Sequence, residues 1–214
     1  YLRQTSDANL DLRGCSADVK AKVQQFRAEA RFLRAYFYWA AMDTFGQVPF
    51  STENTQFGGG YNPPQKPAAE IFDFIVDELN DLASEGSAMP AAQSNYPRAD
   101  KGSVLGLLAR VYLNAEVYTG TAKWAEAKAA CEKIKAYDSS IYPWGVDMTT
   151  DEGQACFAYY IWNNGGDFTD AQGNWTLNSP ENVEAIKFII NMVNAGLTNS
   201  DPANETRYDN QDMF

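Results

Sequence analysis

The chain has 214 residues, of which 45% are hydrophobic, and a formal net charge of −11 at pH 7. This apolar content suffices for a folded core, but no run approaches the ~18 uncharged apolar residues that span a bilayer. The acidic balance argues against a nucleic-acid binder, and the absence of histidine removes His-dependent triads and most zinc sites while leaving carboxylate catalysis open.

The cysteines are too few and too scattered for a disulfide framework: Cys15, Cys131 and Cys156. Cys15 ends a Leu-Arg-Gly-Cys run that loosely matches a lipoprotein cleavage site. The residues before it are polar, whereas a signal peptide has an apolar run at that point. We therefore expect an ordinary loop cysteine here and no lipid anchor within this chain.

Residues 19–45 are predicted to form one long helix that ends at Gly46. Arg27, Arg31 and Arg34 share one side, where they can pair with acids of a neighbouring helix. Two apolar lines occupy the rest of the surface, and a helix that is apolar on two faces is expected to lie between others. The first line is Phe26, Ala30, Leu33, Phe37 and Ala41, and the second is Phe32, Tyr36 and Trp39.

A long loop follows at residues 46–67, rich in Gly, Pro and Asn, and loops of this length are often functional. A second helix is predicted over 68–84, with an apolar stripe inward and acids, among them Glu78, outward. Helices over 99–117 and 122–137 then form a hairpin. Its alternation of small and large residues is typical of a tetratricopeptide-type pair and equally of a generic antiparallel pair.

The remaining 142–214 segment has a different character, because Lys187 and Arg207 are its only bases against eleven acids, whereas residues 1–141 are nearly neutral. This step predicts two segments, 1–141 and 142–214. Residues 142–146 are strand-like, and a capping box of Thr149 and Glu152 predicts a helix over 150–163.

The end of the chain continues this mixed pattern. Residues 167–176 are predicted to form a hairpin whose turn lies at 170–174. Ser179 followed by Pro180 starts a further helix, which is expected to face inward through Val183, Ile186, Ile190 and Val193. Strand, helix, hairpin and helix together indicate an α/β arrangement. The 167–174 loop fails the calcium pattern, because Ala171 and Gln172 take its fifth and sixth positions, so we expect no metal and no cofactor.

Three motifs stand out in the first segment: Ala-Glu-Ala-Arg-Phe-Leu-Arg-Ala-Tyr-Phe-Tyr at 28–38, Phe-Gly-Gln-Val-Pro-Phe at 45–50, and the run at 99–113. Through them, residues 24–139 resemble the SusD/RagB family of outer-membrane glycan-binding lipoproteins. The resemblance implies a mainly α fold, with tetratricopeptide-like hairpins in 1–140. It also implies an oligosaccharide ligand, delivery to a TonB-dependent, SusC-like transporter, and a place at the bacterial outer membrane or cell surface.

Residues 159–168 and 178–186 instead make 142–214 resemble a sugar-type solute-binding protein of ABC importers. This resemblance implies a partial α/β lobe, in which the loop entering the helix at 150 faces the ligand. It makes candidates of Asp147, Asp151, Glu152 and Gln154, although Asp151 and Glu152 equally fit pairing with a helix N-terminus. Two incomplete families in one chain favour a truncated or stitched sequence, without autonomous function, over a natural fusion.

Both resemblances predict non-catalytic binding of oligosaccharide, by the chain itself or as part of an importer. Sugars stack their C–H faces on aromatic rings, which makes Tyr61, Trp144 and Trp175 candidates, although an exposed loop aromatic is the simpler interpretation of Tyr61. Two other classes stay open. A glycosidase needs only two carboxylates, and a helical repeat can serve as a protein-binding module.

Overall fold

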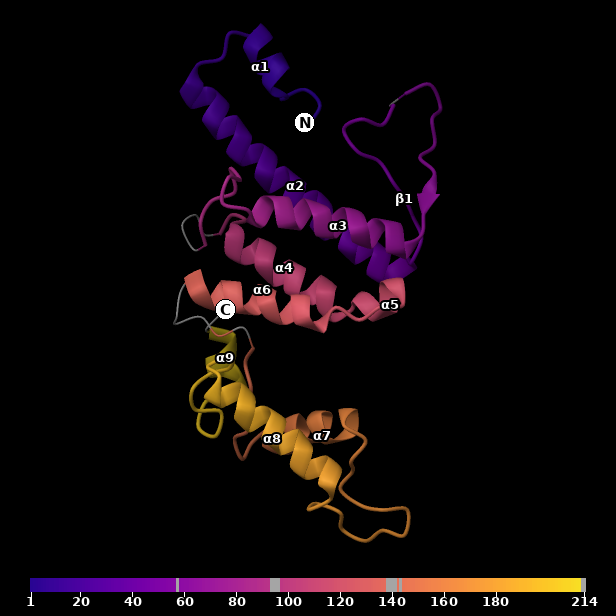
Figure 1. Cartoon of the computed structure of the whole chain (residues 1–214), viewed down its shortest axis with the longest axis vertical. Helices are drawn as coiled ribbons and strands as arrows, with labels where there is room; N and C mark the ends of the chain where they lie inside the picture. The colour runs from indigo at the N-terminus through magenta and orange to yellow at the C-terminus, as the bar shows by residue number, and fades with distance from the viewer. Residues whose placement is uncertain (57, 93–96, 138–141, 143, 213–214) are drawn as a thin grey trace. The chain divides into compact units, whose positions relative to one another are not determined.

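The chain divides into two compact units, Tyr1–Tyr137 and Asp138–Phe214, each with its own helices (Figure 1). The computed structural model describes residues 1–56, 58–92, 97–137, 142 and 144–212. None of the helices in this described part combines the length and the apolar character that a membrane-spanning helix needs.

Four helices of the first unit pack in successive layers, in which α2 contacts α3, α3 contacts α4, and α4 contacts α6 (Figure 1). Two shorter helices, α1 and α5, complete the unit. The bounds are α1 Asp7–Leu12, α2 Ala17–Phe45, α3 Ala68–Ala83, α4 Lys101–Leu113, α5 Ala115–Thr119 and α6 Trp124–Tyr137. The mainly α fold class predicted from the sequence is therefore confirmed.

Helix α3 lies at the centre of this core, as its amphipathic sequence predicts. Its inward stripe is almost completely shielded from solvent at Ile71, Phe72, Ile75, Leu79 and Leu82. The predicted core positions of α4 are buried as well: Val104, Leu107, Leu108, Val111 and Tyr112. Burying these side chains is the main favourable contribution to the stability of the unit.

The helix predicted over 99–117 is interrupted, which corrects that prediction. Asn114 caps the end of α4, because its backbone N–H and its side-chain amide both donate to the carbonyl oxygen of Arg110, the latter at 3.0 Å. Helix α5 begins at the next residue and ends at Gly120, whose positive φ of 74° suits the left-handed cap that glycine adopts without strain. The hairpin of α4 and α6 is otherwise formed as predicted.

The expectation that α2 is covered on two faces is wrong. Its buried positions are Ala28, Glu29, Ala35 and Met42, whereas Phe26, Leu33 and Phe37 of the expected inward line are exposed. Within this unit α2 packs mainly against α3. One side of the helix is therefore covered and the line through Phe37 is not.

The predicted loop at 46–67 contains a small antiparallel pair of strands, β1 (Val48–Pro49) and β2 (Gln65–Lys66). Val48 lies opposite Lys66 and Pro49 opposite Gln65. Phe50 donates its backbone N–H to Pro64 at 3.0 Å and extends the pairing by one hydrogen bond. The pair closes the base of the loop that carries Tyr61.

The second unit contains α7 (Gly153–Asn163), α8 (Pro180–Asn194) and α9 (Arg207–Asp212). Its described residues include two isolated bridges, Trp144 with Thr198 and Thr169 with Trp175. The predicted turn at 170–174 is present, since the backbone N–H of Asp170 donates to the Asn174 carbonyl at 2.9 Å. The α/β character expected of 142–214 is not confirmed.

Residues 144–146 do not form the expected strand because a side chain takes the place of a neighbouring strand. The fully buried Asn199 accepts the Val146 N–H at 2.7 Å and donates to the Val146 carbonyl at 2.9 Å. The backbone of Val146 is thereby satisfied without a ladder. Residue 143 lies outside the described part of the chain.

Two details of the second unit differ from the sequence prediction. The capping box at Thr149 is absent, because Thr149 donates its hydroxyl and its backbone N–H to Asp147, so that α7 begins at Gly153. Helix α8 is capped by Ser179 as predicted, but its buried residues are Asn182, Ala185 and Ile189. Ile190 is exposed, contrary to the inward face assigned to it.

Candidate functional site

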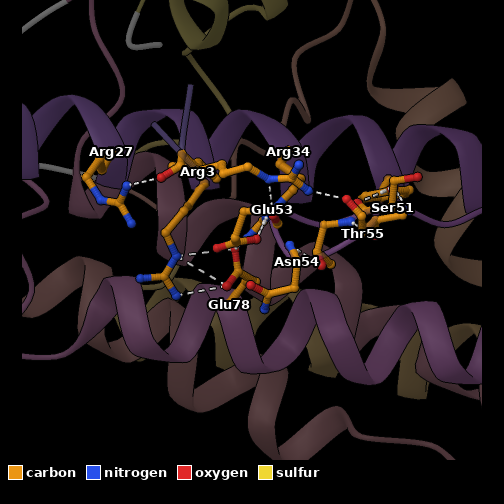
Figure 2. Close-up of polar contacts among 12 residues, drawn as sticks. Arg3, Arg27, Arg34, Ser51, Glu53, Asn54, Thr55 and Glu78 are labelled. Atoms are coloured by element: carbon orange, nitrogen blue, oxygen red, sulfur yellow. Dashed lines mark hydrogen bonds and ion pairs between the residues drawn. The ribbon is translucent and has the colours of Figure 1, made fainter. Parts of the chain in front are cut away.

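A cluster of arginines and carboxylates joins three segments of the first unit. Arg34 of α2 donates to Glu78 of α3 at 2.6 Å and to Glu53 of the following loop at 2.5 Å. Arg31 donates to the same Glu78 at 2.8 Å and to Asp81 at 2.7 Å. Figure 2 shows Arg34, Glu53 and Glu78 converging from these segments. The Glu78 side chain is thus largely buried between helices rather than outward as predicted. The pairing predicted for Arg31 and Arg34 is confirmed.

The N-terminal residues fasten the same loop from its other side. Arg3 donates to the backbone carbonyl of Glu53 at 2.7 Å and also to that of Thr55. Arg27 does not pair with an acid as expected; it bonds to the Leu2 carbonyl and, at 3.0 Å, to the Thr5 hydroxyl. The bonds of Arg3 hold residues 53–55 of the loop that leads to Tyr61, and Figure 2 shows Arg3 beside Glu53 and Thr55.

The charge of Glu53 is stabilised by this arrangement. Burial raises the pKa of Glu53, but the hydrogen bonds from Arg34 and from its own backbone outweigh burial and hold the pKa below its ordinary value. The carboxylate is therefore ionised and bonded at neutral pH. It acts as a fastening for the loop, while Tyr61 itself is exposed beyond it.

A hollow of about 450 Å³ lies beside this cluster, lined by Arg34, Phe37, Tyr38, Ala41, Phe45, Val48 and Pro49. The Tyr38 hydroxyl already donates to the Ser51 carbonyl at 2.9 Å and accepts the Ser51 N–H at 2.7 Å. The Arg34 amino groups are engaged with Glu53 and Glu78. The hollow is thus mainly apolar, and the polar groups that line it are largely taken, which fits a sugar poorly.

Trp144, a candidate from the sequence, is an exposed ring held in place in the second unit. Its indole N–H donates to the Tyr160 hydroxyl at 3.0 Å, while 51% of its surface stays exposed. Tyr160 in turn packs against Phe188 of α8, with ring centroids 6.2 Å apart. Burial raises the pKa of Tyr160 more strongly than the Trp144 bond lowers it. The phenol therefore stays protonated at neutral pH and keeps its own hydrogen to donate.

The carboxylate candidates divide into structural and exposed groups. Asp147 is buried and accepts three bonds, from the Thr149 hydroxyl at 2.8 Å, the Thr149 N–H at 2.9 Å and the Arg207 N–H at 3.1 Å. Glu152 forms an ion pair with Arg207 at 3.3 Å. Both therefore connect the start of α7 to the start of α9.

The other candidates are open to solvent. Asp151 and Gln154 are exposed at the start of α7, and Trp175 is exposed at the end of the 170–174 turn. The structure thus pairs Trp144 with Tyr160, a residue that the sequence analysis did not select. No local pattern links these two residues, because they are 16 positions apart and meet only through packing. Among the described residues no group of three or more Cys, Asp or Glu is placed to hold a metal.

Comparison with known proteins confirms the resemblance to SusD. The chain is 39% identical over 114 residues to the starch-binding protein SusD of Bacteroides thetaiotaomicron, an alignment that covers 53% of this chain and 20% of SusD. Among solved structures it is similar to a laminarin-binding SusD-like protein, with a TM-score of 0.47 and 22% identity over 63% of this chain and 27% of that one. A SusD-like protein of Bacteroides fragilis gives a TM-score of 0.49 and 20% identity over 84% and 30%.

A second group of relatives carries a less specific name. The chain is 29% identical over 104 residues to a putative binding protein of Brucella abortus, covering 49% of this chain and 25% of that protein. No protein-family model matches the chain. The comparisons do not support the importer resemblance of residues 142–214, which stays a prediction. The chain spans about a fifth of the length of SusD and a quarter of the Brucella protein.

Proposed function

We propose that this chain binds glycans and does not catalyse a reaction on them. The proposal is supported by 39% identity with a protein named for binding starch. The Brucella relative is also named as a binding protein, and one of the SusD-like structures is named for binding laminarin. Starch and laminarin are both neutral glucose polymers, so the common ligand chemistry is a chain of uncharged pyranose rings.

The single structural observation that carries the proposal is the exposed, anchored indole of Trp144. A pyranose ring presents C–H groups on its face and hydroxyls at its edge. The Trp144 ring offers an apolar surface to that face, and the adjacent Tyr160 hydroxyl has a hydrogen to donate to a sugar oxygen. Because the indole is fixed by its bond to Tyr160, little conformational entropy is lost when a ligand stacks on it.

The other candidate residues take two roles in this proposal. Trp175, Asp151 and Gln154 are exposed in the second unit and contact the glycan directly, by stacking or by hydrogen bonds. Tyr61 is exposed in the first unit, where it offers a separate stacking surface. Asp147 and Glu152 act as positioning residues, since they fasten the start of α7 through Thr149 and Arg207. Helix α7 is the element that carries Tyr160.

The family resemblance also suggests where a bound glycan goes. A glycan held by this chain passes to a TonB-dependent, SusC-like transporter at the bacterial outer membrane, and the helical first unit provides the docking surface. Capture of such a β-barrel protein by the purified chain, lost when the exposed Phe37 is changed to Glu, would support this part. Capture that is equal for both variants would contradict docking through that face.

Glycan binding is tested by affinity electrophoresis and calorimetry of the whole chain with amylopectin and laminarin. Trp144→Ala is expected to weaken binding about tenfold, the equivalent of roughly 1.4 kcal/mol. Trp124→Ala, which removes an exposed tryptophan of the first unit, is the matched control and should leave binding unchanged. Wild-type protein that binds neither glucan, or that releases reducing ends from them, would overturn the proposal.

A further inference from the structure

A second exposed tryptophan in the second unit is held as firmly as Trp144. The indole N–H of Trp162, near the end of α7, donates to Asp167 Oδ1 at 3.0 Å, and 54% of the side chain stays exposed. The same carboxylate oxygen accepts the backbone N–H of Phe168 at 2.7 Å. The Phe168 ring lies edge-on to the indole, with centroids 6.2 Å apart.

The residue that anchors Trp162 is itself fixed by the backbone. The Asp167 carbonyl accepts hydrogen bonds from Asn182 Nδ2 at 2.9 Å and from the Thr176 hydroxyl at 2.8 Å. Asn182 is only 1% exposed. Phe168 also packs edge-on against Phe157, at 5.8 Å. The loop after α7 is thus held from both sides, and Asp167 keeps its position beside the indole.

Asp167 has one oxygen left for a ligand. Oδ1 accepts the bonds from Trp162 and Phe168, and within the described part of the chain Oδ2 accepts no hydrogen bond. The Trp162 bond, then the Phe168 N–H, hold the pKa of Asp167 below its ordinary value, so the group is an ionised, acceptor-only carboxylate at neutral pH. Its natural partner is a hydroxyl of a ring that lies on the neighbouring indole.

From this geometry we infer a second sugar-contact site, in which a neutral pyranose stacks on Trp162 and donates a hydroxyl hydrogen to Asp167. The inference rests on the proposed glycan binding and defines its ligand class more narrowly. A uronic acid would bring a second negative charge next to Asp167. Residues 142–214 contain two bases, and one of them, Arg207, is bonded to Glu152. The site therefore selects neutral over anionic sugars.

The two tryptophan sites face different directions. Trp144 is bonded to Tyr160, and Tyr160 and Trp162 are two positions apart on α7, which places their side chains about 200° apart around the helix axis. One sugar ring therefore cannot contact both indoles. The contributions of the two sites to binding should add, as they do for separate positions.

The test measures binding of the whole chain to maltohexaose and laminarihexaose, and to a galacturonic acid hexamer, by calorimetry and by the NMR signals of the indole N–H groups. Trp162→Ala should weaken binding of the neutral oligosaccharide about tenfold. Asp167→Asn should lower the preference for neutral over anionic oligosaccharide from about tenfold to roughly twofold or less. Tyr159→Ala, an exposed aromatic on the same helix, is the matched control.

The outcomes separate this inference from the function on which it rests. Wild-type protein that binds neither neutral oligosaccharide overturns both. Wild-type binding that Trp144→Ala weakens, with no shift of the Trp162 indole signal and no effect of Trp162→Ala, overturns the second site alone. A shift of the Trp162 signal that persists in Trp144→Ala supports the second site. Thermal unfolding of each variant shows whether a loss of binding comes from a loss of fold.

Discussion

Glu78 of α3 accepts a hydrogen bond from Arg34 of α2 at 2.6 Å, and both side chains are largely shielded from water. Arg31 bonds to the same carboxylate. Removal of Glu78 therefore takes a charged partner away from both Arg31 and Arg34. We expect Glu78→Ala to lower the free energy of unfolding by about 3 kcal/mol. Urea denaturation followed by far-UV circular dichroism measures this change.

Asp81→Ala serves as the control for that experiment. Asp81 also pairs with Arg31, at 2.7 Å, but its side chain is 63% exposed. Exposed ion pairs contribute at most about 1 kcal/mol. An equal decrease in the free energy of unfolding of the two variants would show that the buried Glu78 pair stabilises the fold no more than the exposed Asp81 pair.

The loop fastening at Glu53 should weaken in acid. The pKa of Glu53 is lowered in the folded chain, so its contribution is complete above the unfolded pKa of about 4.3 and is lost as the pH falls through the folded value. Glu53→Gln should therefore reduce the acid sensitivity of the first unit. Urea midpoints compared between about pH 7 and about pH 3 test the difference in slope. Parallel curves for the two proteins would contradict it.

Position 166 needs a glycine because the Asn182 side chain leaves no room for a Cβ, and not because of an unusual backbone φ. A Cβ at this position would lie 2.0 Å from Oδ1 of the buried Asn182, so one of the two residues would have to move. Gly166→Ala should cost about 1–3 kcal/mol. Gly106→Ala, where a Cβ meets nothing within 4 Å, should instead stabilise α4 by up to about 1 kcal/mol. Thermal unfolding of the two variants gives the comparison.

The anchoring of Trp144 can be tested apart from its ring. Tyr160→Phe keeps the packing against Phe188 but removes the hydroxyl that accepts the indole N–H. We expect glucan binding to fall by about threefold, less than for Trp144→Ala, since the stacking surface remains but is no longer fixed. Calorimetry with amylopectin measures both. A loss as large as that of Trp144→Ala would mean that the hydroxyl itself is the main contact.

Much of the helical framework could be predicted from local pattern. The stripe of Ile71, Ile75 and Leu79 recurs at helical spacing and is buried as expected. Ser179 followed by Pro180 marks the start of α8, because a side-chain cap and a fixed φ are local properties. The predicted start of α7 was wrong, because a nearby side chain binds the residue that was expected to cap the helix. Asp147 binds Thr149 and displaces the start of α7 to Gly153.

The candidate site was predictable only in part. An exposed aromatic such as Trp144 can be suspected from composition, because sugars stack on rings. Its partner Tyr160 cannot, because the two residues are 16 positions apart and meet only through packing. Trp162 and Asp167 are five positions apart, but Asp167 lies in the irregular loop after α7, where no helical or strand periodicity predicts the contact. Periodicity identifies which side chains share a helix face, but it does not identify what covers that face.

The charges and the apolar side chains show which features follow from the sequence and which follow from the fold. The absence of histidine, the near-neutral first part, the acidic last third and the apolar stripe of α3 could all be read from the amino-acid order. Three further features became visible only in the folded chain: Glu78 lies between two arginines, the Phe37 side of α2 is uncovered, and Asp167 holds an exposed indole. Local pattern follows from backbone geometry. The position of Glu78 and the uncovered side of α2 depend instead on how distant helices pack. The contact of Asp167 with Trp162, only five residues apart, depends on the loop after α7, which Asn182 and Thr176 hold in place.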